Sequence, residues 1–185
     1  LAYYANEISH LNEMRPHGES RYRQGVPVKY DPSREKCPLP YSPFKSCTVP
    51  RPIGWLSSIS PDGIDNLAPY SQWQNLTFDP PMVMFAANQY PDGRRKDTVL
   101  NAEQTGWFVW NMATYALREA INISAMALPP HESEFDRARV TRRPAELCNV
   151  PMVAESPVHF ECRYLSTHRF TGNSKVGTVD IVFAQ

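Results

Sequence analysis

The stretch that decides the fold is residues 53–70, which read IGWLSSISPDGIDNLAPY. Its two halves, Ile53–Ser60 and residues 64–70, flank Pro61-Asp62-Gly63, a sequence typical of a tight turn. Two short strand-like segments around such a turn predict a β-hairpin. Pro69 in the second half lacks the backbone N–H that a central strand needs, so we expect that strand at a sheet edge or at a bulge.

Outward from the hairpin, further segments have the apolar content and the length of strands. They cover residues 81–87, 107–113, 157–170 and 177–184. The first of these is continuously apolar after a double proline, which predicts a buried strand. Because strands dominate and connections are short, the sequence predicts a mainly β fold, an antiparallel barrel, rather than a doubly wound sheet.

The predicted helices are few and short. They cover residues 97–105, capped by Asp97 or Thr98 and ended by Gly106; residues 115–126, capped by Thr114; one turn from Ser133; and Ala2–Met14 near the start. Serine, threonine and aspartate are preferred at the first position, and glycine just after the last.

The composition argues against several classes of function. The 185-residue chain has 19 basic and 19 acidic residues, so no net charge draws it to nucleic acid or to an anionic membrane. No apolar run approaches the roughly 18 residues of a membrane span. The four cysteines are widely separated, which favours free thiols and predicts no metal site. Without an export signal, we expect a cytoplasmic protein.

A cluster of positive charge, Arg94-Arg95-Lys96, directly precedes the helix predicted at residues 97–105. A phosphate group at this place would gain from these charges, from the Thr98 hydroxyl and from the first N–H groups of the helix. Taken alone, such a cluster is more often a solvated charge run on a loop.

The order of these features, together with Asn75–Pro81 (NLTFDPP), resembles the flavin reductase-like family, whose members bind FMN in a split β-barrel. The resemblance runs from about Leu39 to the last residue. It implies an N-terminal arm at residues 1–38 and an FMN-binding split-barrel domain at residues 39–185, with a few short helices. The family pattern usually continues beyond the point where this chain stops, so its C-terminal part is expected to be missing.

The resemblance also implies a set of cofactor-binding residues. The two hairpin strands would line a flat slot for the flavin ring, and Asn75 would lie in a loop at the ring edge. The charge cluster would hold the phosphate, and a segment near the end of the second helix would approach the flavin across a dimer interface. The implied residues are Trp55, Leu56, Ser57, Ser58, Ala68, Pro69, Tyr70, Ser71, Asn75, Arg95, Lys96, Asp97, Thr98, Ser124 and Ala125. Outside the family order, the serines would be ordinary strand-end hydroxyls.

The function that the resemblance implies is an FMN-binding oxidoreductase, a flavin reductase in which NADH or NADPH passes a hydride to flavin N5. FMN is the expected cofactor, and FAD is the alternative. The dinucleotide fingerprint G-x-G-x-x-G is absent, so the nicotinamide would dock as a transient co-substrate. No nucleophile with a paired base is evident, so no catalytic residue is predicted.

Two other functions remain open: an FMN-holding electron carrier without nicotinamide turnover, and a non-enzymatic barrel that has lost flavin. We expect a homodimer, because a split barrel leaves the flavin partly open and exposes aromatic-rich strand surfaces. A monooxygenase or another electron-acceptor protein is the expected recipient of the electrons.

Overall fold

The computed structural model describes residues 3–5, 28–40, 43–129 and 131–185. The contacts divide the chain into two units, Leu1–Pro50 and Arg51–Gln185. The predicted arm at residues 1–38 falls wholly within the first unit.

In the first unit, β1 (Tyr3–Ala5) pairs antiparallel with β2 (Val28–Tyr30), and α1 covers Pro43–Ser46. The helix predicted over Ala2–Met14 is therefore wrong at Tyr3–Ala5, where pairing with a strand distant in the sequence overrides local helix signals. The remainder of that predicted helix lies outside the described residues.

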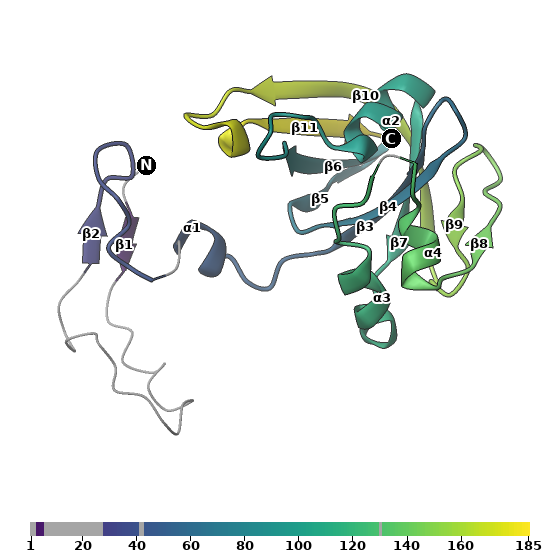
Figure 1. Cartoon of the computed structure of the whole chain (residues 1–185), viewed down its shortest axis with the longest axis horizontal. Helices are drawn as coiled ribbons and strands as arrows, with labels where there is room; N and C mark the ends of the chain where they lie inside the picture. The colour runs from purple at the N-terminus through teal and green to yellow at the C-terminus, as the bar shows by residue number, and fades with distance from the viewer. Residues whose placement is uncertain (1–2, 6–27, 41–42, 130) are drawn as a thin grey trace. The chain divides into compact units, whose positions relative to one another are not determined.

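The second unit is built on one antiparallel sheet of seven strands in the order β4-β3-β7-β10-β11-β6-β5 (Figure 1). The strands are β3 (Gly54–Ile59), β4 (Asp65–Tyr70), β5 (Trp73–Phe78), β6 (Pro81–Asn88), β7 (Trp107–Met112), β10 (His159–Phe170) and β11 (Val179–Ala184). A separate two-stranded sheet joins β8 (Arg142–Arg143) to β9 (Met152–Val153). The predicted mainly β, antiparallel class is confirmed.

The 12-residue strand β10 allows this sheet to curl. Its first part, His159–Arg163, pairs with β7, and its second part pairs with β11. A register shift between Tyr164 and Ser166 lies at the start of the second part, and an irregularity of this kind bends a strand. Side chains from both parts of the sheet consequently share one core, where the ring centroids of Phe85 in β6 and Phe108 in β7 lie 5.3 Å apart.

Short helices cover the two faces of the β3–β4 hairpin. They are α2 (Asp97–Thr105), the 3-10 turn η2 (Tyr115–Leu117), α3 (Arg118–Ile123) and α4 (Glu134–Ala138); a further 3-10 turn, η3, covers Lys175–Gly177. α2 packs Val99 and Ala102 into the barrel core, whereas α3 and α4 cover the other face around Trp55 and Leu67. Among the helices in the described ranges, none has the length and apolarity to cross a membrane.

The hairpin predicted from residues 53–70 is confirmed. β3 pairs with β4, and Gly63 in the turn has a φ of 84°, a left-handed conformation that glycine adopts without strain. β4 is a terminal strand of the sheet, as Pro69 requires. The strands predicted at residues 107–113, 157–170 and 177–184 are also confirmed, with small shifts at their ends.

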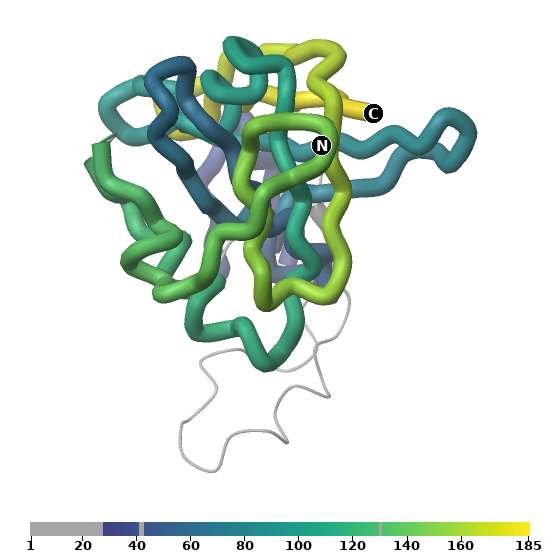
Figure 2. Tube along the Cα trace, turned by 90° about the vertical axis from the view of Figure 1, so that its right-hand side faces the viewer, coloured from purple at the N-terminus to yellow at the C-terminus, as the bar shows by residue number. Residues whose placement is uncertain are grey.

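The loop predicted at Asn75–Pro81 is wrong for most of its length. Residues 75–78 belong to β5, which pairs with β6 through a register shift between Asn75 and Thr77. The β5–β6 hairpin extends away from the rest of the sheet (Figure 2). β6 is buried only at alternate positions, not throughout as predicted, because one face of this antiparallel strand packs on the core.

The helix predicted at residues 97–105 has the predicted bounds but a different capping residue. The N-cap of α2 is Lys96, not Asp97 or Thr98, because the Thr98 hydroxyl bonds to a neighbouring strand instead of to its own helix. Gly106 ends the helix as predicted, with a φ of 81°.

The second predicted helix is shorter than expected. Residues 115–126 form a 3-10 turn followed by α3, which ends at Ile123, and Ser124 turns its hydroxyl onto the Ile121 carbonyl. α4 starts as predicted, because the Ser133 hydroxyl accepts a hydrogen bond from the Phe135 N–H.

Candidate functional site

An open cleft lies where the edge strand β4 meets the start of α2. Its cavity volume is about 110 Å³, below the 300–1,000 Å³ or so that is usual for small-molecule sites, so the cleft is shallow and open to solvent. Its lining residues are Asn66, Ala68–Tyr70, Tyr90, residues 96–98, residues 124–127 and Glu134.

The cleft brings together predicted residues from three separate stretches of the sequence. These are Ala68, Pro69, Tyr70, Lys96, Asp97, Thr98, Ser124 and Ala125. The hairpin and the charge cluster therefore converge on one place, as a ligand with a ring and an anionic tail would require. The other predicted residues do not line this cleft: Trp55, Leu56, Ser57, Ser58, Ser71, Asn75 and Arg95.

Asn66 connects the elements that form one wall of the cleft. Its Oδ1 accepts a hydrogen bond from Thr98 Oγ1 at 2.7 Å, and its Nδ2 donates to Glu134 Oε2 at 2.9 Å. The Leu67 N–H donates to the same Glu134 oxygen at 3.0 Å. Thr98 belongs to α2, Asn66 to β4 and Glu134 to α4, so these bonds fix the mutual position of three elements at the cleft.

Partial burial shifts the pKa values of the ionisable groups at this wall. Burial raises the pKa of Glu134 and lowers the pKa of Lys96, because a charged group loses hydration away from water. Burial likewise raises the pKa of Tyr70. Lys96 lies at the N-terminal end of α2, where the helix dipole also favours an anion.

The Lys96 ammonium rests on an aromatic ring. Its Nζ lies 3.4 Å from the centroid of the Tyr90 ring, a cation–π contact. Both residues line the cleft.

A second, smaller cleft of about 70 Å³ adjoins the first and shares Asn66, Asp97 and Glu134 with it. Asp65 and Glu132 add two further carboxylates to its lining. This surface disfavours an anion, so an anionic tail in the first cleft would be directed to the Lys96 end.

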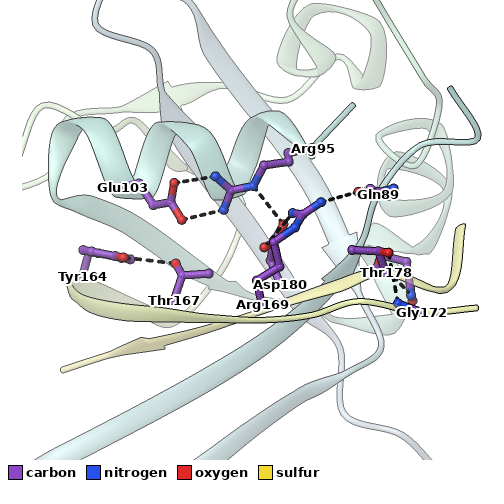
Figure 3. Close-up of polar contacts among 10 residues, drawn as sticks. Gln89, Arg95, Glu103, Tyr164, Thr167, Arg169, Gly172, Thr178 and Asp180 are labelled. Carbon is purple, nitrogen blue, oxygen red and sulfur yellow. Dashed lines mark hydrogen bonds and ion pairs between the residues drawn. The ribbon is translucent and has the colours of Figure 1, made fainter. Parts of the chain in front are cut away.

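Arg95, predicted to hold phosphate, is engaged by two carboxylates. Its guanidinium forms a two-bond pair with Glu103, at 2.8 and 2.6 Å, and its Nε donates to Asp180 Oδ2 at 3.0 Å (Figure 3). Arg169 bonds the same Asp180 carboxylate and also reaches Gln89. The hydrogen bonds from Arg95 hold the pKa of Glu103 below its usual range. Arg95 therefore joins the segment before α2 to the last turn of that helix and to β11, and the shared Asp180 carboxylate extends the link to Arg169 in β10.

Ser124 is held in place by Trp55. Trp55 is fully buried and donates from Nε1 to Ser124 Oγ at 2.9 Å, and that hydroxyl donates in turn to the Ile121 carbonyl. Trp55 therefore does not line the cleft itself; it holds the lining residue Ser124 in position. Leu56 points to the opposite face and belongs to the barrel core.

The two serines of β3 are also fully buried. Asn111 Nδ2 donates to Ser57 Oγ at 3.2 Å, and Asn101 Nδ2 donates to Ser58 Oγ at 3.1 Å. Their hydroxyls join β3 to β7 and to α2. Ser71 follows β4 outside the cleft lining, and Asn75 is exposed on β5.

Sequence reasoning missed Asn66, Tyr90 and Glu134 as cleft residues. A signal for Asn66 existed, because it lies opposite Ser58 in the predicted hairpin and its side chain therefore shares a face with that serine. Tyr90 precedes the turn at residues 91–93, which leads directly into the charge cluster. Glu134 falls in the helical turn predicted from Ser133, and nothing local in the sequence pairs it with Asn66, 68 residues away.

The donors of the cleft fit a flavin nucleotide. Ala68 and Pro69 have compact side chains that a flat ring can approach closely, and Lys96 offers an ammonium at a helix N-terminus. The Thr98 hydroxyl, predicted as a phosphate donor, is already donated to Asn66. Charge and hydrogen-bond donors at a helix start are the ordinary means of binding phosphate.

The chain has relatives among known proteins. Among curated proteins, an uncharacterized protein of Halalkalibacterium halodurans is 39% identical over 115 residues, which cover 62% of this chain and 55% of that protein. This chain thus spans little more than half the length of that relative.

Two solved structures share the fold. Nitrilotriacetate monooxygenase component B from Bacillus cereus is 28% identical, with a TM-score of 0.78 over 85% of this chain and 78% of that one. The 2-nitrobenzoate 2-nitroreductase of Pseudomonas fluorescens is 25% identical, with a TM-score of 0.66 over 77% of this chain and 65% of that one. The predicted split-barrel fold is confirmed.

The family model described as "Flavin reductase like domain" matches residues 46–185. The match covers every strand of the seven-stranded sheet and every residue of the cleft. This chain therefore belongs to the flavin reductase-like family of split-barrel proteins.

Proposed function

We propose that this chain binds FMN, with FAD as the alternative, in the cleft between β4 and the start of α2, and that it reduces the flavin with NADH or NADPH. The observation that carries the proposal is that Ala68–Tyr70 and residues 96–98, which are distant in the sequence, line the same cleft. Membership of the flavin reductase-like family supports a flavin-dependent oxidoreductase.

The ring end of the ligand belongs at β4. An edge strand leaves backbone groups on its outer side without a partner strand, and these groups are the proposed partners of the polar ring edge. Ala68 and Pro69 have compact side chains, so a flat ring can approach the backbone closely. Ala125 would face the ring from the opposite side of the cleft.

The phosphate end belongs at the start of α2. Lys96 supplies positive charge, and the first N–H groups of the helix supply hydrogen bonds and partial positive charge. The Thr98 hydroxyl, predicted as a phosphate donor, gives its proton to Asn66 instead and so holds this end in place. Arg95 supports this end from behind, through Glu103 and Asp180, and does not contact the phosphate in this arrangement.

A bound flavin supplies the redox chemistry, because its ring accepts a hydride from the nicotinamide. The chain contributes placement: it orients the ring along β4, holds the tail at Lys96 and leaves one face open to the co-substrate. A paired acid and base are not required for this reaction, which agrees with a cleft that contains no nucleophile paired with a base among its described lining residues.

A homodimer is part of the proposal. Met112, Val158 and Phe160 are each about 40% exposed, although they share a strand face with Phe108 and Cys162 of the core. The patch formed by Met112, Val158 and Phe160 is thus the open end of the barrel core, and a second copy of the chain would cover it. A monooxygenase or another electron-acceptor protein is the proposed recipient of electrons, supported by the likeness to a monooxygenase component.

The test is anaerobic titration of purified protein carrying FMN with NADH, and separately with NADPH. The proposal predicts that one of them bleaches the visible flavin band within seconds. FMN binding without bleaching by either would identify an electron carrier instead. Absence of FMN and FAD binding would identify a barrel that has lost flavin.

A further inference from the structure

A tight turn brings the charge cluster back beside Tyr90. The Tyr90 N–H donates to the Arg94 carbonyl at 2.8 Å, and the Gly93 N–H donates to the Tyr90 carbonyl at 2.9 Å. Gly93 has a φ of 97°, a left-handed conformation that favours glycine. The chain therefore reverses between Tyr90 and Arg94, and the residues that follow run past the Tyr90 ring.

The three consecutive cations then diverge. Arg95 turns to Glu103 and Asp180. Arg94 and Lys96, on either side of it, both approach the Tyr90 ring, with Cζ of Arg94 at 5.0 Å and Nζ of Lys96 at 3.4 Å from the centroid. This alternation is expected where the backbone is extended, as it is at Lys96, with a φ of −69° and a ψ of 139°.

The two cations on the ring differ in what else they contact. Arg94 is 59% exposed and forms an ion pair with Asp92 at 2.7 Å. Lys96 lines the cleft, and within the described part of the chain it forms no ion pair with a carboxylate. An aromatic ring can hold an ammonium in place without neutralising its charge. The Lys96 charge therefore stays available to a ligand.

We propose that Tyr90 is a positioning residue that holds the Lys96 ammonium at the cleft and so selects a ligand with an anionic phosphate tail over one without it. The inference rests on the proposed flavin site. It adds the residue that makes this site prefer FMN, which carries a phosphate, over riboflavin, which does not. Tyr90 acts through its ring face, and its hydroxyl is not needed for this role.

The experiment compares the dissociation constants of FMN and of riboflavin, which lacks the phosphate, by quenching of flavin fluorescence. The proteins are the wild type, Tyr90→Phe, Tyr90→Leu, Lys96→Met and the double variant Tyr90→Leu/Lys96→Met. Tyr90→Leu should weaken FMN binding about three- to tenfold, the scale of a partly buried cation–π contact, and leave riboflavin binding unchanged. Tyr90→Phe should behave as the wild type, and Tyr90→Leu should have no further effect once Lys96 is replaced.

Three outcomes would overturn the inference: equal weakening of FMN and riboflavin in Tyr90→Leu, loss of FMN preference in Tyr90→Phe, or an undiminished effect of Tyr90→Leu in the Lys96→Met background. If the wild type binds neither flavin, the proposed function itself fails, which is a separate result.

A second measurement does not depend on the folding of Tyr90→Leu. The ring current of Tyr90 should shift the Lys96 ε-methylene proton resonances upfield in the wild type and in Tyr90→Phe. Unshifted resonances in the wild type would contradict the contact on which the inference rests.

Discussion

The hydroxyl of Thr98, in the first turn of α2, donates a 2.7 Å hydrogen bond to the side-chain carbonyl of Asn66 in β4. Thr98 is 1% exposed, so this bond forms away from bulk water. It joins the helix start that carries Lys96 to the edge strand that carries Ala68–Tyr70, and it therefore sets the width of the cleft.

Replacing Thr98 with valine should reduce the free energy of unfolding by about 1 kcal/mol or somewhat more, because the Asn66 carbonyl loses a buried donor. Thr98→Ser keeps the hydroxyl and should retain most of that stability. Urea unfolding of the three proteins measures the difference. Equal stability of Thr98→Val and the wild type would show that the bond does not join the two elements.

Arg95 and Lys96 should separate into a structural and a ligand-binding role. Arg95→Met leaves Asp180, whose side chain is 2% exposed, with Arg169 as its remaining ion-pair partner among the described residues, so it should destabilise the fold by roughly 1–3 kcal/mol. Lys96→Met should change stability little and weaken FMN binding by roughly 1–3 kcal/mol, the scale of a charge-assisted hydrogen bond.

Urea unfolding and FMN titration of both variants measure this pair of effects. The reverse pattern, with a stable Arg95→Met that binds FMN much more weakly than Lys96→Met, would assign the phosphate contact to Arg95.

The raised pKa of Glu134 predicts a pH dependence of stability. A carboxyl whose pKa is higher in the folded chain than in the unfolded chain holds its proton more tightly when folded. Its contribution is therefore fully present below the usual glutamate pKa and is lost as the pH rises through the folded value. The stability of the wild type relative to Glu134→Gln should fall as the pH rises above about 4.5, the ordinary value for this side chain.

Glu103→Gln is the matched control with the opposite sign. The pKa of Glu103 is lowered by its hydrogen bonds with Arg95, so its contribution is present at neutral pH and is lost as the pH falls through the folded value. Unfolding is measured from acid to neutral pH. Over this range the stability of the wild type relative to Glu134→Gln should fall, and its stability relative to Glu103→Gln should rise. A wild-type advantage over Glu134→Gln that grows with pH would refute the assignment for Glu134.

The exposed patch of Met112, Val158 and Phe160 predicts the result of a charge insertion. Phe160→Glu should convert the proposed dimer to a monomer, because a dimer interface would have to bury the carboxylate without a partner. Phe170, which is 57% exposed near the other end of β10, provides a control, and Phe170→Glu should remain dimeric. Sedimentation measures both, and a wild type with the mass of one protomer would contradict the proposal.

The features that could be predicted from the sequence are those decided locally. The turn around Gly63, the end of α2 at Gly106 and the cap at Ser133 each depend on residues within a few positions of one another. The position of β4 at the sheet edge followed from the missing N–H of Pro69. The resemblance to the family predicted that the hairpin and the charge cluster meet at one site, and residues of both line the same cleft.

What could not be predicted depends on distant partners. Nothing in Arg94-Arg95-Lys96 distinguishes the middle cation from its neighbours. Arg95 nevertheless turns away from the cleft, because its partners are Glu103, 8 residues along the chain, and Asp180, 85 residues along it. The interpretation of Asn75 as a loop residue failed because β5 is stabilised by pairing with β6, which no local signal at Asn75 records.

A crystal structure of the protein with FMN tests the central claim most directly. The account predicts the flavin ring along Ala68–Tyr70 and the phosphate within hydrogen-bond distance of Lys96 and of the first N–H groups of α2, with the pair between Arg95 and Glu103 and the bond from Thr98 to Asn66 both intact. A flavin bound elsewhere, or a phosphate seated on Arg95 in place of Glu103, would contradict it.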